Sequence, residues 1–187
     1  MQIRDAVASD AESIAAIGSI EFVRTHEPLL GAAPARAVVE QTYSRAAVVD
    51  SIQRCAAADD AHFLVAERDG RVVGYLHFDC FSDHPELHRI YLDHQEVGRG
   101  TGSALMAELH ARLGDAASYI LLVAEANTTA RQFYLRHGLA EERRIGDGNE
   151  FYRDSMGVQF PPDAPPVPAI VLRRGAARAS PTDAADR

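Results

Sequence analysis

The segment from Gly98 to Gly102 constrains the fold more than any other part of this sequence. Glycine occupies every second position of Gly98-Arg99-Gly100-Thr101-Gly102, after an apolar stretch of strand character and before a helical pattern. A strand that runs through glycines into a helix gathers free backbone N–H groups at the positive end of the helix dipole. Glycine lets the chain approach a phosphate closely. The segment therefore predicts an anion-binding turn within an α/β fold.

Two common phosphate-binding loops do not fit this segment. A Walker loop needs a lysine, and every basic residue of this chain is an arginine. A Rossmann fingerprint needs a small residue at a fixed third position, which is Ser103 when counted from Gly98 and Leu105 when counted from Gly100. That match is weak or fails. A plain strand-to-helix turn stays open as an alternative, although one glycine would serve it.

Composition limits the class of protein. The chain has 187 residues with 27 acidic and 19 basic groups, a net charge of −8, and 47% hydrophobic residues. This length predicts one domain with a core and a pocket. The charge argues against nucleic-acid and anionic-membrane partners and favours a cationic one. Cys55 and Cys80 have no metal-like spacing, and no apolar run resembles a signal peptide or a membrane span, so we expect a cytoplasmic protein.

Residue spacing predicts the elements of the N-terminal part. Ser9 and Glu12 have the spacing of a capping box, which predicts that a helix starts there. The prolines and glycine between Thr25 and Pro34 predict a loop. A second helical pattern, continuous or bent once, runs from Arg36 to Ala57.

A strand pattern begins at His62. The pair Asp69-Gly70 between two apolar runs predicts a β-hairpin. A further strand over 87–93 places Arg89 and Tyr91 on one face, opposite Ile90 and Leu92. The remaining expected elements are a helix after the glycines that ends at Gly114, a strand at 119–124, a helix at 127–137, strands at 140–145 and 169–173, and a loop at 146–168.

Two motifs resemble those of the GNAT superfamily of N-acetyltransferases. Residues 92–105 are similar to the family's pyrophosphate-binding signature, and residues 127–139 are similar to its second signature. Val97 departs from the pattern, because many members carry arginine or glutamine there. The resemblance covers nearly all of 2–173. It implies one α/β (α+β) domain over 1–174 with a mixed, mostly antiparallel sheet of about six or seven strands, flanking helices and splayed central strands. Residues 175–187 are expected to be a disordered tail.

The resemblance also implies acetyl-CoA as cosubstrate. No metal is expected, because the spacing of the cysteines and histidines does not support one. The pantetheine arm is expected between the strands at 87–93 and 119–124, where a backbone N–H can polarise the acetyl carbonyl. Asn127 is expected to bind the coenzyme, to cap its helix, or to do both. The expected cofactor-binding residues are Ile90, Tyr91, Leu92, Val97, Gly98, Arg99, Gly100, Thr101, Gly102, Ser103, Asn127, Ala130 and Tyr134.

The resemblance gives Tyr134 the role of general acid, since the family's tyrosine at this motif position faces the coenzyme sulfur and can protonate the departing thiolate. A tyrosine that only packs is the open alternative. The base is expected to be Glu86, near the position from which some members recruit one. Other candidates for the base, each also compatible with a plain surface role, are His88, Asp93 and Glu125.

These expectations add up to transfer of an acetyl group to a primary amine of a small molecule or peptide, by direct attack in a ternary complex. No cysteine is placed to form an acyl-enzyme. The acceptor pocket is expected from 25–34 and 146–168. A protein N-acetyltransferase and a non-catalytic CoA-binding regulatory module remain alternatives, and the sequence leaves a homodimer open. His26, His77 and His84 are expected in loops or the sheet, without a metal role.

Overall fold

The computed structural model of this protein describes residues 1–82 and 84–175. Apart from Gly175, the tail expected to be disordered lies outside the described residues. The strands are β1 (Gln2–Asp5), β2 (His62–Arg68), β3 (Arg71–Asp79), β4 (Glu86–Leu92), β5 (Tyr119–Ala124), β6 (Ala140–Ile145) and β7 (Ala169–Arg174). The helices are α1 (Ala11–Leu30), α2 (Ala32–Thr42), α3 (Arg45–Ala56), α4 (Thr101–Leu113), α5 (Thr128–Arg136) and α6 (Gly148–Met156).

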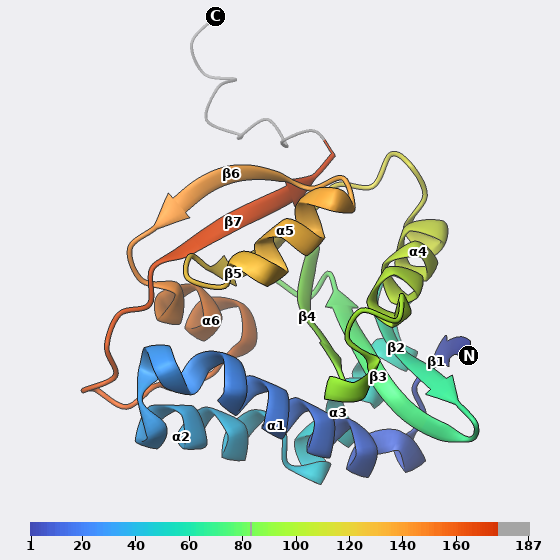
Figure 1. The fold of residues 1–187 in the computed structure, drawn as a ribbon, viewed down its shortest axis with the longest axis horizontal. Coiled ribbons are helices and arrows are strands. Elements are labelled where there is room, and N and C mark those ends of the chain that lie inside the picture. The colour runs from blue at the N-terminus through green and yellow to red at the C-terminus, as the bar shows by residue number, and fades with distance from the viewer. Residues whose placement is uncertain (83, 176–187) are drawn as a thin grey trace, which may run out of the picture.

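The strands form one seven-stranded sheet in the order β1-β2-β3-β4-β5-β7-β6. Neighbouring strands are antiparallel except for the central pair β4 and β5, which is parallel. Helices α1, α2 and α3 lie on one side of the sheet, and α4 and α5 lie on the other (Figure 1). The expected fold class, a mixed and mostly antiparallel sheet with flanking helices, is confirmed.

The central strands β4 and β5 pair only at their starts. Their one paired position joins Glu86 and Ile120, and the Ile120 N–H donates to the Pro85 carbonyl at 3.0 Å. Farther along, the edge of β4 that faces β5 has no partner strand among the described residues. Backbone donors and acceptors on that edge are therefore free to bind a ligand. The predicted splay of the central strands is confirmed.

Each face of the sheet carries its own core. On the α4 side, Leu105, Met106 and Leu109 have no exposed surface. Ile90 and Leu92 of β4 pack into this core, whereas Tyr91 packs against the core on the α1 side. The alternation predicted for β4 is therefore confirmed, and the strand presents different side chains to the two helical layers.

Strong local signals set several elements. Asp69 and Gly70 have φ values of 52° and 74°, as a type I′ hairpin turn requires, so the predicted hairpin of β2 and β3 forms. The second helical pattern divides into α2 and α3, in agreement with one bend. Ser44 makes the break because its hydroxyl accepts the Ala47 N–H at 3.2 Å and caps α3.

The prediction for the start of α1 is partly wrong. The helix begins at Ala11 after a short 3₁₀ turn, with Asp10 at the N-cap, so the capping box of Ser9 and Glu12 is not used. The Asp10 carboxylate accepts the Val7 N–H at 2.8 Å. A charged acceptor makes the stronger hydrogen bond, which explains why Asp10 orders this turn.

The loop predicted at 25–34 is wrong as well. Helix α1 continues through Pro28 and breaks only at Gly31, which has a φ of 83°. Pro34 lies in the first turn of α2, where a missing N–H costs no hydrogen bond. His26 consequently lies in a helix and not in a loop or the sheet.

The segment at 146–168 also contains a helix that the sequence did not predict. Asp147 caps α6 by accepting the Asn149 N–H at 3.0 Å, and Gly157, with a φ of 67°, ends it. The prolines of this segment all follow the helix. Residues 146–147 and 157–168 are irregular, so the loop prediction is wrong only for the part that α6 occupies.

Candidate functional site

The glycine turn connects β4 to α4. Gly98 and Gly100 have φ values of 80° and 83°, in the left-handed region that favours glycine. Gly100 is the N-cap of α4, and no side chain caps the helix there. A Cβ atom at either glycine would meet no other atom within 4 Å, so the turn borders open space. Free N–H groups of the first helical turn at an open surface form the geometry that binds anions.

Glu96 fixes this turn from beneath. Its carboxylate accepts the Thr101 hydroxyl at 2.7 Å and the Arg68 guanidinium at 3.0 Å. These two hydrogen bonds lower the pKa of Glu96. A charged Glu96 therefore ties the start of α4 to the end of β2. Thr101 is fully buried with its hydroxyl turned to Glu96, away from the open side of the turn.

A cleft runs along the turn between β4 and α5, and we call it the glycine cleft. All the expected cofactor-binding residues line it except Arg99 and Thr101. The Arg99 side chain is exposed and lies 3.6 Å from Glu96. Sequence reasoning missed six further lining residues, namely Glu21, Thr25, Glu96, Thr129, Phe133 and Arg136.

Two polar residues of the second motif face the glycine cleft. The Asn127 side chain accepts the Ala130 N–H at 3.1 Å, so it caps α5 and also lines the cleft. Tyr134 is only 8% exposed. Burial raises the pKa of its phenol, which therefore stays protonated at neutral pH. A protonated phenol can donate a proton to a group in the cleft.

A second hollow, which we call the inner hollow, lies against β4 and β5 and is closed by α1, α2 and α6. It encloses about 600 Å³ of space free of protein atoms, counting the part open to solvent. Tyr91 lines both this hollow and the glycine cleft, so the two meet at β4. The segments expected to form the acceptor pocket contribute His26, Leu30, Gly148, Asn149, Tyr152, Met156, Val158, Phe160 and Val167.

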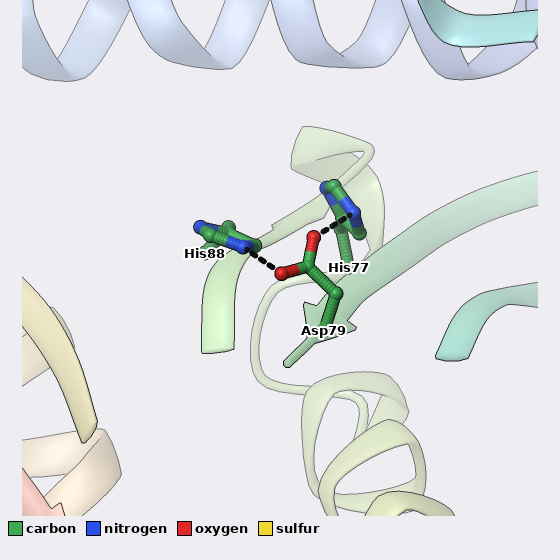
Figure 2. A group of neighbouring side chains, drawn as sticks. All are labelled: His77, Asp79 and His88. Atoms are coloured by element: carbon green, nitrogen blue, oxygen red, sulfur yellow. Dashed lines mark ion pairs between the residues drawn. The ribbon is translucent and has the colours of Figure 1, made fainter. Parts of the chain in front are cut away.

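A cluster of buried titratable side chains lies behind the inner hollow. His77 pairs with Arg89 and Phe78 with Leu87 across β3 and β4, so His88 is the extra residue of a β-bulge. Figure 2 shows the rings of His77 and His88 on either side of Asp79. The Nε2 atom of His77 lies 3.1 Å from one carboxylate oxygen of Asp79, and the Nε2 atom of His88 lies 2.9 Å from the other.

Glu86 extends this cluster on the other side of His88. The second ring nitrogen of His88 lies 3.3 Å from the Glu86 carboxylate, which is 1% exposed. His88 lines the inner hollow, whereas Glu86 lines neither the hollow nor the glycine cleft. Glu86 therefore reaches the hollow only by way of His88.

The members of the cluster hold different charges. Burial lowers the pKa of His88, but hydrogen bonds to Asp79 and Glu86 outweigh it and raise the value to about 9. Burial lowers the pKa of His77 to about 3 despite its bond to Asp79. Burial would raise the pKa of Asp79, yet the two rings lower it well below its usual range. At neutral pH, His88 and Asp79 are charged and His77 is neutral.

The same cluster could hold a metal ion, which sequence spacing did not indicate. One ligand atom from each of His77, Asp79 and His88 lies within 4.8 Å of the others, and all three residues are buried. Two imidazoles and a carboxylate form a common ligand set for transition metals. Asp79 also pairs directly with both rings, and the ring N–H groups compensate the negative charge of its carboxylate.

The other base candidates lie away from both hollows. The Asp93 side chain accepts the Gln95 N–H at 3.0 Å, and Glu125 pairs with Arg144. Neither residue lines the inner hollow or the glycine cleft. The structure thus brings Glu86 and His88 toward the site and leaves Asp93 and Glu125 outside it.

We predict that His88 makes stability depend on pH above neutrality. Its folded pKa of about 9 lies above the unfolded value, so its contribution is full below about pH 6.5 and is lost as the pH rises through about 9. The wild-type protein should lose on the order of 3 kcal/mol across this window. Urea unfolding of His88→Gln should show a flatter profile there. An equal loss in the variant and the wild type would contradict the assignment.

Comparison with known proteins shows what this chain is similar to. The family model described as acetyltransferase (GNAT) domain matches residues 59–139, which include the hairpin, the glycine turn and α5. A search of the curated proteins found no matching sequence. None of the helices in residues 1–82 and 84–175 combines the length and apolar character that crossing a membrane requires.

Solved structures share the fold over nearly the whole chain. The PaiA N-acetyltransferase of Thermoplasma acidophilum, solved in complex with coenzyme A, has a TM-score of 0.72 at 18% identity and covers 94% of this chain and 98% of its own. The ribosomal-protein-alanine N-acetyltransferase of Brucella melitensis has a TM-score of 0.71 at 20% identity, and the match covers 94% of this chain and 100% of its own. YncA of Salmonella typhimurium, solved with its cofactor acetyl-CoA, has a TM-score of 0.67 at 14% identity, and the match covers 97% of each chain.

At these identities the structural likeness concerns the fold. The family model adds the sequence pattern of the segment that contains the glycine turn. The chain therefore has the sequence pattern of a GNAT acetyltransferase domain over residues 59–139, and over nearly its whole length it has the fold of the N-acetyltransferases named above.

Proposed function

We propose that this protein transfers the acetyl group of acetyl-CoA to a primary amine of a small molecule or peptide, by direct attack in a ternary complex. The observation that carries the proposal is the meeting of two separate hollows at Tyr91. One hollow has the anion-binding turn and a protonated phenol, and the other is partly open to solvent and has no anion-binding turn. Two substrates can thus occupy the protein at once, as direct transfer requires.

The glycine cleft is the proposed coenzyme site. When bound there, acetyl-CoA supplies the activated acetyl thioester. The N–H groups between Val97 and Ser103 bind the pyrophosphate, and the unpaired edge of β4 around Ile90 to Leu92 binds the pantetheine arm. Arg99 and Arg136 add positive charge at the mouth of the cleft. A β4 N–H polarises the acetyl carbonyl.

Tyr134 and Glu86 are the proposed proton-transfer groups. The Tyr134 phenol donates its proton to the leaving thiolate. Glu86 takes up the proton of the acceptor ammonium through a relayed water, and His88, which lines the inner hollow and contacts Glu86, positions the carboxylate. Glu86→Gln should therefore lower turnover and leave coenzyme affinity unchanged. Unchanged turnover would remove Glu86 from the proton route.

A thiol-release assay with acetyl-CoA and a panel of amines tests the proposed function. We expect free coenzyme A to appear only when an acceptor is present, and the acceptor to gain one acetyl group by mass spectrometry. A chelator should not change the rate, since no metal is part of this proposal. Coenzyme binding without transfer to any amine or peptide would favour a non-catalytic regulatory module.

The acceptor's size class remains part of the proposal. A protein N-acetyltransferase would accept a peptide at the inner hollow, and the peptide arm of the panel distinguishes that function. The cytoplasmic location and the homodimer stay predictions.

A further inference from the structure

Arg89 lies on the wall of the inner hollow without an acidic partner. Its guanidinium carbon is 5.2 Å from the centre of the Tyr43 ring, and one guanidinium nitrogen is 3.9 Å from the Met156 sulfur. Among the described residues, no carboxylate oxygen lies within 4.0 Å of the Arg89 nitrogens. By contrast, arginines such as Arg4 and Arg68 form ion pairs at 2.7 and 3.0 Å.

A partly buried guanidinium among aromatic rings keeps its charge, because arginine does not lose its proton in proteins. Withdrawing a charge from water is costly unless a counter-charge or hydrogen-bond acceptors compensate it. The face of the Tyr43 ring and the nearby hydroxyls of Tyr43 and Tyr75 provide part of that compensation. The planar N–H donors of Arg89 still match a carboxylate, which they can bind through two parallel hydrogen bonds.

No acidic side chain offsets Arg89 at the inner hollow, because none of the described residues that line it is acidic. His88 also lines the hollow, but the carboxylates of Asp79 and Glu86 lie 2.9 and 3.3 Å from its ring nitrogens and offset its charge. The wall of the hollow is therefore positive at Arg89, although the chain carries a net charge of −8. A polycationic acceptor is disfavoured there, and an anionic group is favoured.

The hollow also favours an apolar body. Apart from these polar groups, its wall is mainly aliphatic and aromatic, with Phe22, Leu30, Val38, Val158 and Phe160 among the lining residues. Positive charge beside an amine lowers the pKa of its ammonium form, which makes the neutral nucleophile more available. An acceptor with an amine, a carboxylate and an apolar side chain satisfies each of these features.

Building on the proposed function, we propose that the acceptor is a small apolar amino acid and that Arg89 binds its carboxylate. The assignment differs from the preference for a cationic partner that net charge alone suggested. Local charge decides here because Arg89 lines the hollow itself, whereas solvent and salt screen the more distant surface charges.

Matched acceptor pairs test this inference on the wild-type enzyme. Leucine, methionine and phenylalanine are each compared with the amine left when the carboxylate is removed, and with the amino acid amide. We expect kcat/KM for the best amino acid to exceed that of both analogues by at least about 30-fold. Spermidine and a peptide with a free N-terminus should be poorer still. Equal or better turnover of the decarboxylated amine, spermidine or the peptide would overturn the inference and leave the proposed function intact.

Arg89 variants test the residue itself. In Arg89→Gln, the ratio of kcat/KM between the amino acid and its decarboxylated amine should fall toward one, and Arg89→Lys should retain part of it. Thermal unfolding and coenzyme affinity show whether each variant is folded. A preference that survives in a folded Arg89→Gln would remove Arg89 from carboxylate binding. If the wild type binds acetyl-CoA but acetylates nothing, the proposed function fails, and this inference fails with it.

Discussion

Replacing Tyr134 with phenylalanine should lower kcat by roughly 10²- to 10⁴-fold, the usual contribution of general acid catalysis. The phenol lies in the glycine cleft, and burial raises its pKa, so it holds its proton at neutral pH. Phenylalanine keeps the ring and removes only the hydroxyl, and coenzyme affinity should therefore change little. Loss of kcat and kcat/KM together would mark an interaction made in the transition state.

Tyr119→Phe provides a matched control for this prediction. Tyr119 is fully buried and bonds to His110 at 2.9 Å, but it lines neither hollow. Its variant should lose some stability and keep its turnover. Near wild-type single-turnover rates in Tyr134→Phe would contradict the acid role. Collapse of coenzyme binding in that variant would show that the hydroxyl is structural.

Replacing Gly100 with aspartate should weaken acetyl-CoA binding by at least an order of magnitude. The new carboxylate would stand at the positive end of α4, where the pyrophosphate is proposed to bind, and would repel it. A Cβ at this position meets no other atom within 4 Å, so the side chain would occupy the open space of the cleft. Isothermal calorimetry measures the change in Kd.

Two variants separate charge from backbone strain in this experiment. Gly100→Asn has the same positive φ and nearly the same size without the charge, so it should weaken binding less than Gly100→Asp. Gly114→Asp places an aspartate at a φ of 76° at the other end of α4, where a Cβ also meets open space. Coenzyme affinity should be unchanged there. Unchanged affinity in a folded Gly100→Asp would exclude the glycine turn as the pyrophosphate site.

Elements with strong local signals were predictable from the sequence. The hairpin at Asp69-Gly70, the strand at 119–124 and the helix capped by Asn127 form as expected, because turn residues and periodicity agree at each of them. Helical Pro28 and the unpredicted α6 show the limit of breaker signals. Proline and glycine mark a local change of direction, and tertiary packing decides whether a helix continues beyond it.

The site was predictable only in part, for a physical reason. Residues near the glycines share one stretch of chain, so the motif specified most of the cleft lining. The cluster of His77, Asp79 and His88 joins two strands across a β-bulge, and a one-residue shift of register is not visible in a sequence. Alternation placed Arg89 beside Tyr91 on one face. Its lack of an acidic partner depends on the helices that close the hollow.

The crystal structure of the acetyl-CoA complex tests the central claim most directly. The account predicts that the pyrophosphate binds the N–H groups between Val97 and Ser103, and that the sulfur lies within hydrogen-bonding distance of the Tyr134 hydroxyl. The acetyl group should then point past Tyr91 into the inner hollow. A coenzyme bound outside the glycine cleft, or one whose acetyl group points away from the inner hollow, would contradict the account.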